Sequence, residues 1–105
     1  MPKFVLIYRN ASPPSTPEEG QHHMAAWQEW SASLGSAQID PGMPFGQTVA
    51  ISKAGENVDI GPNVLNGVSV IEAEDCHAAR AMAASCPHLN LGGDIVIAEG
   101  IELPM

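Results

Sequence analysis

Two histidines and two tryptophans fall within nine residues, in the segment HHMAAWQEW from His22 to Trp30. An imidazole can move a proton near neutral pH, and an indole can stack on an aromatic or apolar ligand. His23 and Trp27 are four residues apart, which places them on the same side of a helix. The segment therefore predicts a site in which His23 is the acid/base group and Trp27 binds substrate, unless both side chains only pack.

A second candidate group lies in the segment Cys86-Pro87-His88. The negative end of a helix dipole disfavours a thiolate, so packing is the simpler role for Cys86 unless a charged histidine lies beside it. We retain Cys86 as a catalytic candidate and His88 as a substrate-binding candidate. Zinc could in principle use His22, His23, Cys86 and His88, but no strong ligand spacing is present, and we expect no metal and no cofactor.

Two acidic residues complete the candidate site. Asp40 could rim the pocket and orient the imidazole of His23, although an Asx turn with Pro41 and Gly42 explains it more simply. Glu72 and Glu99 each continue an apolar strand pattern. Glu72 could therefore enter a closed cavity as a substrate-binding residue, and Glu99 could do the same. The simpler alternative is that both lie in water at the ends of their strands.

Periodicity and turn residues predict the elements that would position these groups. We expect strands at 3–9, 47–52, 67–73 and 94–99, and helices at 17–34 and 76–85. Thr16, Pro17 and Glu19 form a capping box at the first helix, and Asp75 is the N-cap of the second. Segment 37–46 is predicted as a turn-rich connection and 52–63 as a hairpin arm or long loop.

The resulting order, strand-helix-strand-strand-helix-strand, indicates one α+β domain over 1–105 with a ferredoxin-like βαββαβ fold. Right-handed crossovers place both helices on one face of an antiparallel-rich sheet. The strands are apolar on both sides, so the other face would expose a broad apolar surface. We therefore expect a homodimer in which two sheets pack face to face.

Composition limits the partners. Twelve Asp and Glu against four Lys and Arg give a net charge of −8, and the four cations are scattered. Such a chain would repel phosphate groups, so we expect neither nucleic acid nor an anionic membrane surface as a partner. Two cysteines without a disulfide-framework spacing favour the cytoplasm.

Several segments together resemble one known family: HMAAWQEW with Leu34 and Gly35, DPGMPFG, GVSVIEAED, a helix ending in CPHL, and GGDIVIAE. They are similar, in order and spacing, to the YCII-related (DGPF-type) domain family. The resemblance implies a dimeric α/β barrel. It also implies a histidine on the first helix, matched here by His23, and an aspartate before the proline that ends the second helix. Cys86 occupies that last position, and the DGPF segment appears only as DIGPN, residues 59–63.

One branch of the family removes chloride from a chlorinated hydroxylated aromatic ring. We therefore expect cofactor-free, lyase- or isomerase-like acid/base chemistry on a small organic molecule with an aromatic ring. Two alternatives stay open: a non-catalytic ligand-binding or structural dimer, and a domain that associates with a larger enzyme or regulator.

Overall fold

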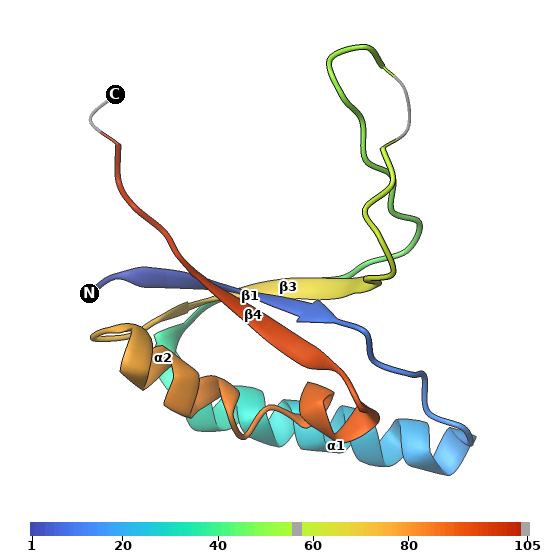
Figure 1. Ribbon diagram of the computed structural model, residues 1–105. Helices are drawn as coiled ribbons and strands as arrows, with labels where there is room; N and C mark the ends of the chain where they lie inside the picture. Colours follow the sequence, from blue (N-terminus) through green and yellow to red (C-terminus); the bar gives the residue numbers. More distant parts are fainter. Residues whose placement is uncertain (56–57, 104–105) are drawn as a thin grey trace.

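The backbone forms a four-stranded antiparallel sheet with two helices against one face. The computed structural model describes residues 1–55 and 58–103. Its elements in chain order are β1 (Lys3–Arg9), α1 (Pro17–Leu34), β2 (Gln38–Pro44), β3 (Leu65–Glu72), α2 (Cys76–Ala83) and β4 (Asp94–Glu99), with short 3₁₀ helices at Gly35–Ala37 and Pro87–Leu91. The strand order is β2-β3-β1-β4, and both helices lie on the same side of the sheet (Figure 1). The α+β, ferredoxin-like expectation is confirmed.

The core forms between this sheet and the helices. Phe4, Leu6 and Tyr8 alternate along β1 and are buried, and Ile71 of β3 lies opposite Phe4 in register. Trp30 of α1 closes the other side, where its indole N–H donates to the carbonyl of Met82 at 3.0 Å. The alternation of β1 therefore determines which of its side chains face the helices.

The first helix begins and ends as its sequence predicts. The Thr16 hydroxyl accepts a hydrogen bond from the backbone N–H of Glu19 at 3.1 Å. The Glu19 carboxylate reaches back one residue further than in a standard capping box, to the backbone N–H of Ser15 at 3.0 Å and to its hydroxyl at 2.7 Å. Gly35 ends the helix with a positive φ of 55°. These contacts fix the register of α1, and with it the direction of His23 and Trp27.

The expectation of a turn-rich connection at 37–46 is wrong, because β2 occupies most of it. Prolines and glycines are typical of turns, but an edge strand also tolerates them. β2 lies at the sheet edge, and its register with β3 shifts twice, between Gln38 and Asp40 and between Asp40 and Met43. Gly42 is required there, since a Cβ would lie 1.7 Å from the carbonyl oxygen of Val68.

The strand expected at 47–52 is also absent, apart from a single bridge residue at Ile51. Residues 45–55 and 58–64 leave the sheet instead, and the N–H of Val58 donates to the carbonyl of Ala50 at 2.7 Å. This agrees with the arm or long loop expected at 52–63, of which Glu56 and Asn57 lie outside the described residues. We call residues 45–55 and 58–64 the arm.

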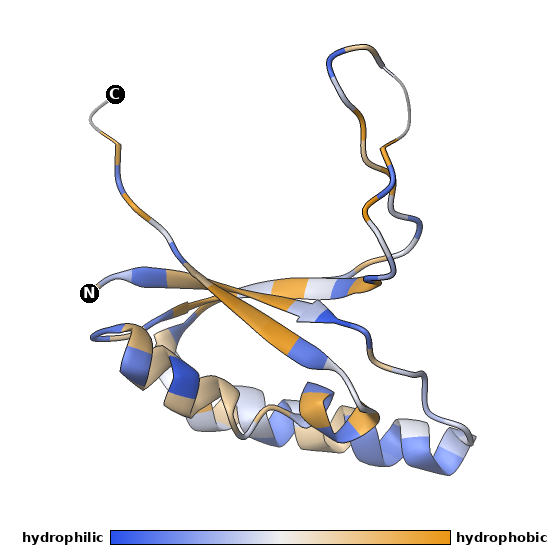
Figure 2. Cartoon of the chain, viewed as in Figure 1, coloured by the Kyte–Doolittle hydropathy of each residue, from blue (hydrophilic) through white to orange (hydrophobic). Residues whose placement is uncertain are grey.

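The sheet face opposite the helices is apolar and uncovered. Its side chains are Val5, Ile7, Val68, Val70 and Val96, which pair across β1, β3 and β4. The arm and the C-terminal tail both rise from this side (Figure 1). Figure 2 shows the apolar strands between them. The sequence expectation of a second apolar face is confirmed.

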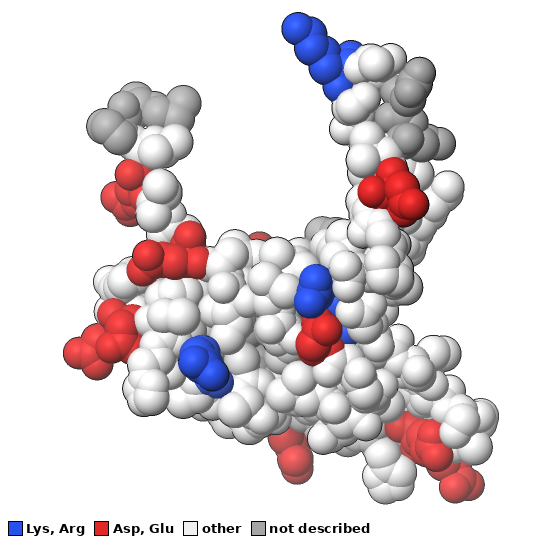
Figure 3. All heavy atoms as spheres, in the orientation of Figure 1, with Lys and Arg blue, Asp and Glu red and all other residues white. Residues whose placement is uncertain are grey.

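No helix in residues 1–55 or 58–103 is long and apolar enough to cross a membrane. Acidic side chains are dispersed over the face shown in Figure 3, with no cluster of basic ones.

Candidate functional site

A pocket of about 500 Å³ lies between the middle of α1 and the adjacent end of the sheet. Its walls come from α1, the end of β1 and the loop after it, β2, the start of β3, and the 3₁₀ helix at Pro87–Leu91. Four prolines and two methionines make most of the lining apolar: Pro13, Pro14, Pro41, Pro44, Met24 and Met43. Pockets of this size and character accommodate small organic molecules.

Three of the six site residues expected from the sequence line this pocket: His23, Trp27 and His88. The other three do not, although Asp40 directly precedes the lining residue Pro41. His23 and His88, which lie far apart in the sequence, thus line the same pocket.

His23 and Trp27 form a hydrogen-bonded pair on α1. The indole N–H of Trp27 donates to Nε2 of His23 at 2.7 Å. An indole nitrogen can only donate, so Nε2 is unprotonated and the neutral ring carries its hydrogen on Nδ1. Desolvation lowers the pKa of His23, and repulsion from His88 lowers it further. His23 is therefore a neutral imidazole at neutral pH, with a tautomer set by Trp27.

Trp27 is held in place by two other aromatic rings. Its ring lies edge-to-face with Tyr8 at 5.2 Å and with Trp30 at 5.4 Å between centroids. Such T-shaped pairs add about 0.5–1.5 kcal/mol each beyond simple burial. Trp27 thus connects His23 to the core and forms a rigid wall of the pocket.

Tyr8 is a pocket residue that the sequence did not suggest. Its phenol hydrogen-bonds to the hydroxyl of Ser69 on β3. Burial raises its pKa to about 12, so the phenol stays protonated at neutral pH. The only sequence signal was its place on the buried side of β1, which predicts core packing and not a site.

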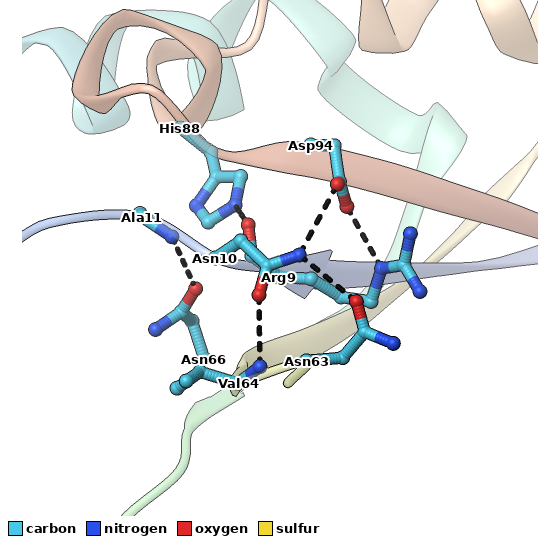
Figure 4. Close-up of polar contacts among 8 residues, drawn as sticks. All are labelled: Arg9, Asn10, Ala11, Asn63, Val64, Asn66, His88 and Asp94. Carbon is cyan, nitrogen blue, oxygen red and sulfur yellow. Dashed lines mark hydrogen bonds and ion pairs between the residues drawn. The ribbon is translucent and has the colours of Figure 1, made fainter. Parts of the chain in front are cut away.

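His88 is buried, and its Nε2 lies 2.9 Å from the carbonyl oxygen of Arg9 (Figure 4). A carbonyl oxygen only accepts, so Nε2 carries a hydrogen. Gly93 makes room for this contact, since a Cβ there would lie 2.4 Å from Nε2 of His88 and 2.7 Å from that carbonyl oxygen. Gly93, the second glycine of the pair before β4, therefore positions His88.

A polar network fixes the chain where β1 enters the pocket wall. Nε of Arg9 donates to Asp94 at 2.8 Å, and the hydrogen bond from Arg9 is the main cause of the lowered pKa of that carboxyl group. Asn10 adopts a positive φ of 61°, and its side-chain oxygen accepts from the N–H of Val64 at 2.8 Å. Figure 4 shows these contacts around the end of β1. The loop that follows is thereby anchored beside the pocket.

Cys86 lies outside the pocket and is 2% exposed. Burial raises the pKa of its thiol to about 11, which keeps it protonated at neutral pH. Both properties favour the packing role over the catalytic one.

The two acidic candidates do not contact His23. Asp40 accepts a hydrogen bond from the N–H of Gly42 at 2.8 Å, which is the Asx turn expected as its simpler role. Glu72 lies at the far end of β3 opposite Lys3, and its carboxylate is 4.0 Å from the terminal amine. Trp27, and not a carboxylate, therefore orients the imidazole.

No group of three or more His, Cys, Asp or Glu within residues 1–55 and 58–103 is placed to hold a metal ion.

The environment of His23 predicts a pH dependence of stability. Its pKa is lowered from an ordinary value of 6.5, so just below pH 6.5 the unfolded chain binds more protons than the folded one. We expect stability to fall as the pH is lowered from about 6.5 through the folded-state pKa of His23. NMR titration should give a midpoint below 6.5 for His23, and Trp27→Phe should raise it, because the indole hydrogen bond stabilises only the neutral ring. An unchanged midpoint in Trp27→Phe would contradict the His23–Trp27 pairing.

The same fold occurs in a solved enzyme. The 5-chloro-2-hydroxyhydroquinone dehydrochlorinase (TftG) of Burkholderia phenoliruptrix, in complex with 2,5-dihydroxybenzoquinone, superposes with a TM-score of 0.58 over 95% of this chain and 95% of that chain. The two sequences are 17% identical, so the likeness shows the fold alone. No profile of a known family and no curated protein matches this chain in sequence. Membership of the YCII-related family, which this fold fits, stays a prediction.

Proposed function

We propose that the chain binds a small planar aromatic molecule with hydroxyl or oxo groups, and performs cofactor-free acid/base chemistry on it. One observation carries the proposal: a pocket of about 500 Å³, walled by Trp27, is lined by two histidines from separate elements. The dehydrochlorinase with the same fold was solved with a dihydroxybenzoquinone, a ligand of this shape.

The apolar lining supports a ring-shaped ligand. Prolines and methionines present flat or adaptable apolar surfaces, and Trp27 offers a fixed aromatic wall. His23 is neutral and its Nε2 is engaged by Trp27, so the hydrogen on its Nδ1 is the one that it can offer to an oxygen of the ligand. In this proposal Trp27 positions the ring and the imidazoles handle the proton.

A second candidate function is non-catalytic binding of the same kind of ligand. It is favoured by the absence of Asp and Glu among the described residues that line the pocket. Cys86, in the position where the resemblance places an aspartate, is buried and protonated. No carboxylate is therefore available to stabilise an imidazolium at His23.

An assay can distinguish catalysis from non-catalytic binding. It measures turnover of a panel of hydroquinones and catechols, with and without a ring chlorine. An enzyme should convert at least one of them, and His23→Asn should lose at least a hundredfold in rate. His22→Asn is the matched control, because His22 is the exposed neighbour outside the pocket and should keep the wild-type rate. Binding without turnover supports the second candidate, and absence of both contradicts the proposal.

We further propose that two chains form a homodimer through the uncovered sheet faces. Apolar side chains continue beyond the sheet along the arm and tail that rise from the same side, including Val49, Ile51, Ile101 and Leu103, each more than half exposed in the single chain. A second copy would cover both the sheet and these extensions, and soluble monomers rarely leave such a surface open. We also propose a cytoplasmic location, which the free thiols of Cys76 and Cys86 support.

A further inference from the structure

Each pocket histidine has one ring nitrogen committed to a protein group whose hydrogen-bonding role is fixed. Nε2 of His23 accepts from the indole N–H of Trp27, so its hydrogen is on Nδ1 when the ring is neutral. Nε2 of His88 donates to the carbonyl oxygen of Arg9, so its neutral ring has a lone pair on Nδ1. The two rings are therefore held in opposite tautomers.

The free nitrogens of both rings are open. Neither Nδ1 atom has a hydrogen-bond partner among the described residues. All fully buried side-chain nitrogen and oxygen atoms in these residues do have a partner. The two Nδ1 atoms are therefore accessible from outside the protein. The second ring nitrogen of His88 points away from the Arg9 carbonyl, on the side of Ala11 (Figure 4). Ala11 and His88 both line the pocket.

We infer that His23 and His88 form a complementary pair, in which His23 donates a hydrogen bond to the ligand and His88 accepts one. The inference rests on the proposed function, because it names the ligand chemistry of that same pocket. The ligand class is an aromatic ring with a hydroxyl donor on one side and an acceptor oxygen on another. His88, and not His23, then receives the hydroxyl proton, while Nδ1–H of His23 binds the acceptor oxygen.

The surrounding charges agree with this division. His23 faces Trp27 and His88, and repulsion between the imidazoles disfavours protonation of His23 when His88 carries a proton. Asp94 would attract a positively charged His88. This attraction contributes to the lowered pKa of the Asp94 carboxyl group. The nearby phenol of Tyr8 and thiol of Cys86 both remain protonated, because burial raises the pKa of each to about 12 and about 11. The described residues thus place a carboxylate near His88, whereas His23 meets burial and the second imidazole.

The tautomers can be read directly in the wild-type protein by long-range ¹H–¹⁵N NMR at a pH where both rings are neutral. We expect His23 to show hydrogen on Nδ1 and His88 to show hydrogen on Nε2. Hydrogen on Nε2 of His23, or on Nδ1 of neutral His88, would overturn the inference. Because no variant is required, the test holds even if replacements of the buried His88 fail to fold.

A binding cycle tests the ligand side with two probes. The first, 4-methoxyphenol, has one hydroxyl donor, and the second, 1,4-dimethoxybenzene, has the same ring without a donor. We expect His88→Phe to weaken binding of the phenol relative to the diether by about 3–10-fold, the effect of one hydrogen bond. His22→Phe, which alters a histidine outside the pocket, should leave the ratio unchanged.

If both probes bind and His88→Phe leaves the ratio of their affinities unchanged, the inference is overturned. If neither probe binds while the tautomers are as stated, the proposed function fails, and the ligand assignment fails with it.

Discussion

Ile7→Glu should convert the protein from a dimer to a monomer. Ile7 lies in the middle of the uncovered face, where it pairs with Val68 on β3 and Val96 on β4. In a dimer packed through this face, each copy would bury the new carboxylate against the partner's apolar side chains. Burial of an unpaired charge costs several kcal/mol, and symmetry doubles the effect. The dissociation constant should therefore rise by at least about a thousandfold, which sedimentation velocity over a concentration series would measure.

Ala25→Glu provides the matched control. Ala25 is exposed on α1, on the opposite side of the sheet from the proposed interface, and the substitution adds the same charge in a helix that tolerates glutamate. The dissociation constant of the Ala25→Glu dimer should equal that of the wild-type dimer. A wild-type protein that sediments as a monomer, or an Ile7→Glu protein that stays dimeric, would contradict the proposed interface.

Gly42→Ala should destabilise the fold by about 2–4 kcal/mol. Gly42 has a φ of 71°, and the new Cβ would lie 1.7 Å from the carbonyl oxygen of Val68. Two effects therefore add: a positive φ that costs about 1 kcal/mol for a residue with a Cβ, and a backbone collision that must move β2 away from β3. Thermal unfolding at fixed protein concentration should show a midpoint lower by about 10–20 °C.

Gly61→Ala separates these two effects. Gly61 also has a positive φ, 79°, and its N–H donates to Asp59 at 2.8 Å, as that of Gly42 donates to Asp40. A Cβ at Gly61 has nothing within 4 Å. The substitution should cost only about 1 kcal/mol. If Gly42→Ala and Gly61→Ala lowered the free energy of unfolding equally, the close packing of β2 against β3 would be contradicted.

Local signals in the sequence were sufficient for most of the fold. The bounds of β1 follow from an apolar run that ends before a proline-containing loop, those of α1 from Thr16 and Gly35, and those of β4 from an apolar run bounded by glycines. β2 was missed because its prolines are tolerated only at a sheet edge, and edge position depends on the strand order of the whole sheet. The short strand expected at 47–52 does not form, because a local segment does not say whether a partner strand is present.

The sequence predicted three residues that line the pocket, but it predicted a contact between two of them only where they share one element. His23 and Trp27 are one helical turn apart, so their contact follows from spacing. The approach of His88 depends on the carbonyl of Arg9 and the missing side chain of Gly93, which are brought together by the pairing of β1 with β4. Glu72 was selected from its strand pattern alone, which indicates a face of the sheet but not which end lies near the pocket.

The two tryptophans allow the central claim, that an aromatic ligand binds beside His23, to be tested directly. The indole N–H of Trp27 faces the pocket histidine, whereas that of Trp30 is bonded to the carbonyl of Met82 in the core. In ¹H–¹⁵N spectra recorded during titration with 4-methoxyphenol, we predict a saturable shift of the Trp27 indole signal with little change at Trp30. No shift of the Trp27 signal, or equal shifts of both, would contradict the account.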